Sequence, residues 1–343
     1  MNQRAHERLL DANANRAAEG LRVLEDVARF QLETAELSGI AKRLRHQIRS
    51  AMPPQIVAWR DAGSDVGEAI KASDEGIRET LVAVIRANAA RAQEALRVLE
   101  EGLKLAGYAA AAGAAEAVRY STYRLESDLL SKLPAWMFWR VRLYVLVDVA
   151  LCADPVRVAV AAVRGGAGAV QLRAKNLPVR VYRELAARMQ DEVRAAGALF
   201  VVNDHVAVAR AISADAIHVG QEDLDPRDVR SVVGPQCAIG VSTHAHAQVI
   251  AAQHAGADYL GIGPMYATAT KPHEPCQGPG LLDAVRESLT CPNYAIGGID
   301  LERLRALRGQ IPHGIAVAGV VCKAADPERA AAELMDVLQP EDA

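Results

Sequence analysis

Polar and apolar side chains alternate in the segment Gln171-Leu172-Arg173-Ala174-Lys175. If this segment is a β-strand, its period of two residues places Gln171, Arg173 and Lys175 on one face and the apolar pair on the other. A protein interior does not bury two cations without an anion to pair with them. The spacing therefore indicates an anion-binding site at the end of this strand. The alternative is a pair of solvated loop cations.

Carboxylates follow the next two apolar segments of the chain. Asn203 and Asp204 end the first of these segments, and Asp223 follows the second. Mg²⁺ accepts carboxylate ligands and completes its octahedron with phosphate oxygens and water. We therefore predict that Asp204 and Asp223 bind Mg²⁺ beside a diphosphate. For Asp223 the alternative is a role at the amino terminus of a helix.

A further group of polar residues follows later apolar segments. Ser242 ends one of them, and Thr268, Thr270 and Lys271 leave the next one together. They begin a proline-rich loop that runs to Pro279 and is longer than an ordinary connection between a strand and a helix. Loops of this kind close over substrates in many enzymes, so we expect a lid here.

Small residues end the last two apolar segments, at Gly297-Gly298 and at Ala318-Gly319. Small side chains expose the backbone N–H groups, and in barrel enzymes the loops after the seventh and eighth strands bind phosphate. The positions of Gly298 and Gly319 therefore predict a second anion site.

The segments that carry these residues predict eight strands. Short runs rich in Val, Ile and Leu recur at 143–149, 169–173, 199–204, 216–220, 238–242, 259–265, 294–298 and 314–320. Amphipathic helical patterns fill the intervals, so consecutive strands need parallel crossover connections. The pattern predicts an α/β fold of the (β/α)8 or TIM-barrel type, with its chemistry at the carboxyl ends of the strands. The rival is a doubly wound open sheet, but residues 148–154 lack its glycine-rich turn.

The first third of the chain is helical and carries an internal repeat. The segment DANANRAAEGLRVLED at 11–26 matches RANAARAQEALRVLEE at 86–101 in 11 of 16 positions. Such a duplication predicts an all-α helical bundle of two similar units that pack against each other. We expect a duplicated helical bundle at 1–133, a linker at 134–140 and a TIM-barrel catalytic domain at 141–343.

Arg16 and Arg91 occupy equivalent positions in the two copies of the repeat. The simpler interpretation assigns these and neighbouring charges to ion pairs on helix surfaces, which contribute little to stability. In the alternative, the two guanidinium groups grip an anionic ligand together.

Composition excludes several classes of protein. Lys+Arg 39 against Asp+Glu 42 gives a formal charge of -3 without a basic tract, so nucleic acid is not expected as a partner. No run reaches the roughly 18 apolar residues of a membrane span, and the first residues lack a signal peptide's core. We therefore expect a cytoplasmic protein with no membrane partner. The five cysteines include no CxxC pair and indicate neither disulfides nor zinc.

Six motifs in this order, QLRAK, VVND, HVGQED, GVSTH, GPMYATATK and AIGGI, resemble the thiamine-phosphate synthase family over about residues 141–338. The resemblance implies a Mg²⁺-dependent transferase of thiamine biosynthesis on a TIM barrel. Its substrates would be hydroxymethylpyrimidine diphosphate and hydroxyethylthiazole phosphate, which it would join with release of diphosphate. The helical domain has no role in this resemblance, and the sequence leaves open whether the chain forms a homo-oligomer.

The resemblance also implies roles for individual residues. Those that would hold the pyrimidine diphosphate are Gln171, Arg173, Lys175 and Asn203. The Mg²⁺ ligands would be Asp204 and Asp223. The catalytic residues would be Arg173, Ser242 and Lys271, with Ser242 at the reacting pyrimidine or diphosphate and Lys271 at the departing diphosphate.

The thiazole phosphate would contact Thr268, Thr270 and the amides of Gly298 and Gly319. The family commonly has a serine near the end of the eighth strand, where this chain has Ala318-Gly319-Val320. Backbone amides would then bind the phosphate without that hydroxyl.

The diphosphate of an electron-rich aminopyrimidine can leave before the new bond forms, so leaving-group stabilisation and orientation would be the main tasks. His218 and His244 could act as bases, although structural roles suit them better. A thiazole tautomerase and a phosphosugar isomerase are rival enzymes, but neither needs both Asp204 and Asp223 with a diphosphate clamp. A phosphate-metabolite sensor is the rival that is not an enzyme.

Overall fold

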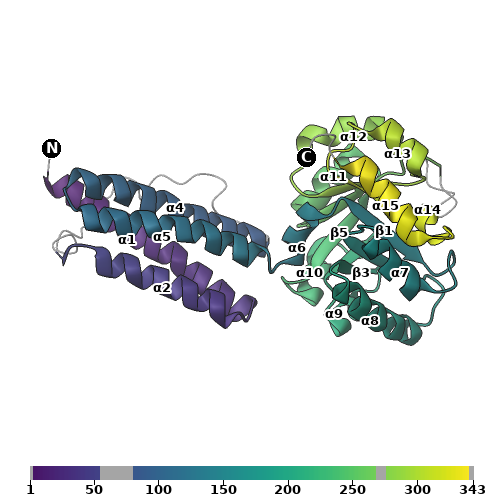
Figure 1. Cartoon of the computed structure of the whole chain (residues 1–343), viewed down its shortest axis with the longest axis horizontal. Helices are drawn as coiled ribbons and strands as arrows, with labels where there is room; N and C mark the ends of the chain where they lie inside the picture. Colours follow the sequence, from purple (N-terminus) through teal and green to yellow (C-terminus); the bar gives the residue numbers. More distant parts are fainter. Residues whose placement is uncertain (1–2, 55–79, 268–275, 340–343) are drawn as a thin grey trace. The chain divides into compact units, whose positions relative to one another are not determined.

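The computed structural model describes residues 3–54, 80–267 and 276–339 of the chain. The chain divides into two compact units, Met1–Lys132 and Leu133–Ala343. The first is helical and the second contains all eight strands (Figure 1).

The described helices of the first unit are α1 (Gln3–Asp26), the π-helical turn η1 (Val27–Gln31), α2 (Ala35–Ala51), α4 (Leu81–Leu105) and α5 (Ala109–Leu130). Helix α1 packs against α2 and α4, and α5 packs against α4 and α2. Leu21 and Leu24 of α1 and Leu96 and Leu99 of α4 are fully buried. Gly20 permits the close approach, because a Cβ there would lie 2.7 Å from the carbonyl oxygen of Asn88.

Two buried carboxylates cross-link the helices of this unit. Glu25 of α1 pairs with Arg45 of α2 at 2.8 Å, and Glu100 of α4 pairs with Arg119 of α5 at 2.9 Å. Glu100 also accepts a hydrogen bond from Lys104 at 2.6 Å. Burial raises the pKa of Glu100, but the bonds from Lys104 and Arg119 outweigh burial and lower this pKa to about 2.

Replacing Glu100 by glutamine should lower the free energy of unfolding by about 3 kcal/mol near pH 7, because Arg119 then stays buried without its counter-charge. The folded pKa of about 2 lies below the ordinary value of 4.5. The contribution is therefore complete above about pH 4.5 and is lost as the pH falls toward 2. Urea titrations should show the difference between wild type and variant shrinking on acidification. Glu101→Gln, at a half-exposed carboxylate, is the control; an equal difference at pH 3 and pH 7 would contradict the assignment.

The second unit is a closed barrel in which each strand pairs in parallel with the next and β8 pairs with β1. Its strands are β1 (Leu143–Asp148), β2 (Ala169–Arg173), β3 (Leu199–Asn203), β4 (Ala216–Val219), β5 (Ala238–Thr243), β6 (Tyr259–Ile262), β7 (Asn293–Ile296) and β8 (Gly314–Val317). This confirms the TIM-barrel prediction.

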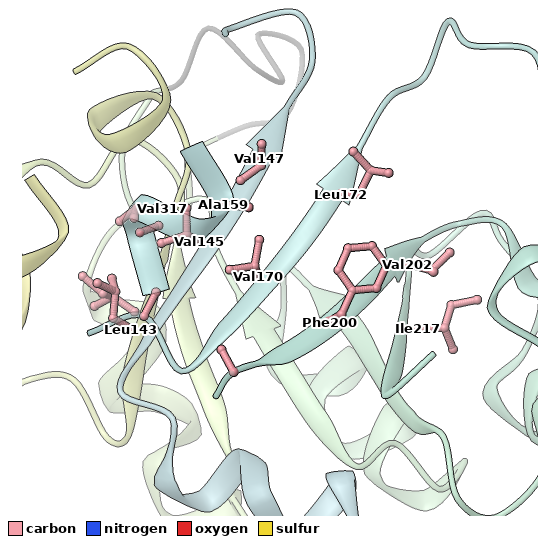
Figure 2. Close-up of a cluster of buried hydrophobic side chains, with 14 of the residues drawn as sticks. Leu143, Val145, Val147, Ala159, Val170, Leu172, Phe200, Val202, Ile217 and Val317 are labelled. Atoms are coloured by element: carbon pink, nitrogen blue, oxygen red, sulfur yellow. The ribbon is translucent and has the colours of Figure 1, made fainter. Parts of the chain in front are cut away.

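Helices follow the strands and surround the barrel (Figure 1). They are α7 (Pro155–Arg164), α8 (Val179–Ala195), α9 (Val206–Ile212), α10 (Pro226–Val233), α11 (His246–His254), α12 (Gly280–Val285) with the 3₁₀ turn η3 (Arg286–Ser288), α13 (Leu301–Leu307), α14 (Gly319–Cys322) and α15 (Pro327–Leu338). The main core lies between the strands and these helices. Figure 2 shows part of it, with Val145, Val170 and Val202 on neighbouring strands and Ala159 on α7.

Several strands end earlier than the hydrophobic pattern predicts. Strand β6 ends at Ile262, because Gly263-Pro264 follows and proline has no N–H to donate to a ladder. Strand β8 ends at Val317, and Gly319 already begins α14. At β8 the chain therefore leaves the sheet directly before Gly319, which was predicted to bind phosphate.

The segment predicted as a linker closes the amino-terminal end of the barrel. Helix α5 ends at Leu130, and Pro134 begins α6 (Pro134–Met137), which leads into the 3₁₀ turn η2 (Phe138–Arg140). The Phe138 ring is fully buried and stacks on Tyr259, the first residue of β6, with centroids 4.0 Å apart. The Phe138 carbonyl accepts hydrogen bonds from Tyr294 and His313.

Candidate active site

Strand β2 carries Gln171 and Arg173 into the barrel interior. Ala169 belongs to the interior cluster, and the period of two places Gln171 and Arg173 on the same face, whereas Leu172 and Ala174 pack toward the helices. Arg173 is 7% exposed, and no carboxylate in the described part of the chain pairs with it. A buried, unpaired guanidinium favours binding of an anion. Lys175 follows on the exposed turn after β2.

Gln171 is oriented by a tyrosine that the sequence analysis did not single out. Its Nε2 donates to the Tyr144 hydroxyl at 2.5 Å, and this hydroxyl lies 3.2 Å from that of Tyr259. The Gln171 Oε1 atom is buried and has no hydrogen-bond partner among the described residues. Burial raises the pKa of Tyr144, so it remains a neutral phenol. The arrangement leaves one amide acceptor for a ligand that carries an N–H group.

Asp204 directly follows β3 in a left-handed backbone conformation, with φ of 60°. Aspartate and asparagine tolerate this conformation better than most residues. The Asp204 amide donates to the carbonyl of His218 at 3.0 Å, which ties the end of β3 to β4. Burial, together with the charge of Asp223, raises the pKa of Asp204, while the charge of Lys175 opposes this rise.

Asp223 lies in the exposed loop after β4, and its carboxylate accepts a hydrogen bond from the Gly220 amide at 2.7 Å. It does not cap the next helix. That position belongs to Asp225, whose side chain accepts from the amide of Arg227 as α10 begins. The capping alternative for Asp223 is therefore wrong, and its carboxylate interacts with that of Asp204 instead.

Ser242 lies near the end of β5 and bonds to the neighbouring strand. Its hydroxyl lies 2.9 Å from Nε2 of His218, on β4, and its carbonyl accepts from Gln221 at 2.6 Å. His218 thus has a structural partner beside the site. His244 has one too, because its Nδ1 lies 2.6 Å from the carbonyl oxygen of Gly263.

The predicted phosphate loops have different steric requirements. Gly298 has a φ of 64°, and a Cβ there would lie 2.7 Å from the carbonyl oxygen of Ala267. Glycine is required there for both reasons. At Gly319 a Cβ would meet no heavy atom of the described residues within 4 Å. Thr268, Thr270 and Lys271 lie outside the described residues.

Gly319→Ser should lower the KM for a phosphate-bearing substrate about tenfold, because the space is open and a hydroxyl bonded to an anion contributes about 1.5 kcal/mol. Gly298→Ser is the matched control and should raise this KM, since its backbone and its neighbours exclude a side chain. Steady-state kinetics on both variants measures the effect. A KM left unchanged by Gly319→Ser would place the phosphate elsewhere.

The donor set at Asp204 and Asp223 fits Mg²⁺. The charge of Asp223 raises the pKa of Asp204, because two neighbouring carboxylates repel each other unless a proton or a cation lies between them. In the residues that the structure describes, no group of three or more His, Cys, Asp or Glu side chains is arranged to hold a metal. One or two carboxylates completed by substrate phosphates and water is the arrangement that Mg²⁺ favours over a full protein cage.

Comparison with known proteins agrees with this geometry. A family model described as thiamine monophosphate synthase matches residues 143–321, which is more than half of the chain. The chain belongs to this family. A thiamine-phosphate synthase from Gloeobacter violaceus is 41% identical over 336 residues, covering 96% of each chain. Another from Synechocystis is 36% identical over 334 residues, again covering 96% of each.

A solved structure is similar to part of this chain. Thiamine phosphate pyrophosphorylase from Pyrococcus furiosus is 33% identical, with a TM-score of 0.54, and its match covers 59% of this chain and 97% of that one. A second model, the ThiD2 family, matches residues 8–128 of the helical unit. As a thiamine monophosphate synthase family member, the chain is a transferase of thiamine biosynthesis. Among the described helices, none is long and apolar enough to cross a membrane.

Two residues that hydrogen-bond to the site, Tyr144 and Gln221, were not predicted from the sequence. Tyr144 lies in an apolar run and Gln221 in a polar one, and their hydrogen-bond partners are distant in sequence. The strand period could have identified Tyr144. Tyr144 and Asp148 are four residues apart in β1, so they lie on the same, interior face of the strand. A hydroxyl on that face needs a partner when it is buried.

Proposed function

We propose that the chain joins hydroxymethylpyrimidine diphosphate to hydroxyethylthiazole phosphate and releases diphosphate. The observation that carries this proposal is the buried Arg173, unpaired among the described residues, at the same end of the barrel as the interacting carboxylates of Asp204 and Asp223. A cationic side chain and a metal-binding carboxylate pair together suit a diphosphate better than a single phosphate. The chain's family supports the same reaction.

Asp204 and Asp223 would hold Mg²⁺ at this site. When bound, the ion supplies positive charge that stabilises the leaving diphosphate. Lys175 would add a further positive charge, since its charge already acts on Asp204. Asn203, the last residue of β3, lies directly before Asp204 and would donate its amide to the same substrate.

The pyrimidine would lie over the end of β2 and β5. The Gln171 Oε1 atom, which has no partner among the described residues, would accept a hydrogen bond from the exocyclic amine of the aminopyrimidine. Ser242, held by His218, would face the reacting methylene or the diphosphate. Such fixed polar groups orient the substrate before the reaction.

The reaction exchanges one bond for another. The C–O bond between the pyrimidine methylene and the diphosphate breaks, and the diphosphate leaves with the electron pair. The thiazole nitrogen then donates its lone pair to the delocalised pyrimidine cation and forms the C–N bond. Arg173, with Lys271 from the sequence prediction, would neutralise the charge that grows on the diphosphate.

The thiazole phosphate would bind on the opposite side of the mouth. The amides of Gly298 and Gly319 follow β7 and β8, where barrel enzymes commonly bind phosphate. Thr268 and Thr270 are proposed to contact the same phosphate.

Incubation with each candidate substrate tests the proposal. The purified chain with Mg²⁺ should form thiamine phosphate from the two substrates together and should not isomerise a thiazole carboxylate phosphate. Isomerisation without synthesis would favour a tautomerase. Binding of both substrates with no product would favour a sensor.

A chain that begins at Pro134 should remain a soluble synthase with kcat within about threefold of the full chain, because the barrel has its own core. All eight strands and every proposed site residue lie beyond Pro134. The Pyrococcus furiosus relative supports this expectation, because its match covers 97% of that chain but only 59% of this one. The measurement is activity per soluble molecule. Soluble protein that binds both substrates but does not join them would show that the helical unit takes part in the reaction.

A further inference from the structure

A continuous row of buried rings runs from the amino-terminal end of the barrel to the proposed site. The Phe138 ring stacks on Tyr259 with centroids 4.0 Å apart and an interplanar angle of 13°. Tyr259 in turn lies 5.6 Å from the His218 ring, and His218 bonds to the Ser242 hydroxyl at 2.9 Å. Phe138 and Tyr259 are both fully buried.

The row has little room to move. A Cβ on Gly240 would lie 2.1 Å from Cζ of Tyr259, so the tyrosine ring lies directly against the backbone of β5. The His218 ring lies beside the backbone of β6 at an ordinary packing distance, because a Cβ on Gly261 would lie 3.4 Å from its Cε1. Close-packed interiors transmit displacements of this kind, because a ring that shifts has no void to occupy.

Tyr259 also reaches the other side of the site. Its hydroxyl lies 3.2 Å from that of Tyr144, and Tyr144 accepts the hydrogen bond from Gln171. The position of this one ring therefore affects both Ser242, through His218, and Gln171, through Tyr144. Both are residues that we place at the pyrimidine diphosphate.

We propose that Phe138, which precedes the first strand and touches no substrate, is a positioning residue for the pyrimidine half of the reaction. Its ring fixes Tyr259, and Tyr259 fixes the orientation of Gln171 and Ser242. This inference rests on the proposed roles of those two residues.

The ring of Phe138 can be changed without removing the segment that carries it. The Phe138 carbonyl accepts hydrogen bonds from Tyr294 at 2.8 Å and from His313 at 3.0 Å. Both bonds belong to the backbone of residue 138 and remain when the side chain is replaced. Leucine keeps an apolar side chain there but lacks the flat face that stacks on Tyr259.

Steady-state kinetics of full-length Phe138→Leu tests the inference. We expect the KM for the pyrimidine diphosphate to rise about tenfold and kcat to fall, because small misplacements of orienting groups have large kinetic effects. The KM for the thiazole phosphate should stay within about twofold, since its proposed contacts lie after β7 and β8. Val141→Ala is the matched control. Val141 is buried in the same cluster as Phe138 and Tyr259, but it has no ring that stacks on Tyr259, so it controls for a loss of apolar packing.

If Phe138 acts in folding alone, Phe138→Leu and Val141→Ala should both lower the thermal stability. The KM values for the pyrimidine diphosphate and the thiazole phosphate should then change by the same factor. That result for Phe138→Leu would overturn the inference. Tyr259→Phe keeps the ring and removes its hydroxyl, so it tests the arm through Tyr144 even if Phe138→Leu fails to fold. A KM for the pyrimidine diphosphate that Tyr259→Phe leaves unchanged would overturn the part of the inference that acts through Tyr144.

Gln171→Ala separates this inference from the proposed function. If it raises the KM for the pyrimidine diphosphate and Phe138→Leu does not, the site assignment stands and the positioning role is wrong. If Gln171→Ala leaves that KM unchanged, the assignment of Gln171 is wrong, and the part of the inference that acts through Tyr144 is overturned with it.

Discussion

Asp204→Asn is expected to lower kcat by about 100- to 1000-fold, the loss that follows when a group stabilising transition-state charge is removed. An amide cannot offset the charge of Mg²⁺, so the diphosphate would leave less readily. Asparagine tolerates the φ of 60° at this position, and the barrel should therefore stay folded. Asp223→Asn should have an effect of the same order.

The measurement is kcat at saturating concentrations of both substrates over a series of Mg²⁺ concentrations, with circular dichroism to confirm folding. Excess Mg²⁺ should restore activity only in part. Glu222→Gln is the control, because Glu222 is the exposed neighbour of Asp223 and has no proposed role. If both asparagine variants turned over at near wild-type rates at limiting Mg²⁺, the proposed metal site would be wrong.

Arg173→Gln is expected to lower kcat about 100-fold and to raise KM much less, because charge grows on the diphosphate as the C–O bond breaks. Arg173→Lys should retain part of the activity, since it keeps the charge and loses the bidentate geometry. Arg180→Gln is the control, because the Arg180 side chain is 89% exposed on α8 and pairs with Glu184. An effect of Arg173→Gln on KM alone would remove its proposed transition-state role.

The barrel could be predicted from the sequence because apolar residues recur with a different period in strands than in helices. At β2, for example, the alternation of Gln171 and Arg173 with Leu172 identified both the strand and its interior face. The ends of the strands were harder to predict. The apolar pattern continues through Gly263-Pro264 and Ala318-Gly319, and the geometry of these loops rather than hydrophobicity ends the ladder.

Long-range hydrogen bonds could not be predicted from one sequence. Tyr144 and Gln171 are 27 residues apart, and Phe138 meets Tyr294 across 156 residues. Such contacts depend on closure of the barrel and leave no local spacing. The same limit explains why 134–140 was predicted as a linker, although Phe138 is part of the barrel interior. The residue that caps α10 was also hard to predict. Asp223 and Asp225 are the same residue type close to the start of the helix, and only the structure shows that Asp225 is the cap.

One measurement tests the central claim most directly, namely the stoichiometry of products formed by the purified full-length chain from the two substrates with Mg²⁺. Thiamine phosphate and diphosphate should appear in equal amounts, and chelation of Mg²⁺ should stop both together. Diphosphate released without thiamine phosphate in the presence of both substrates, or thiamine phosphate formed at an undiminished rate after chelation, would contradict the account.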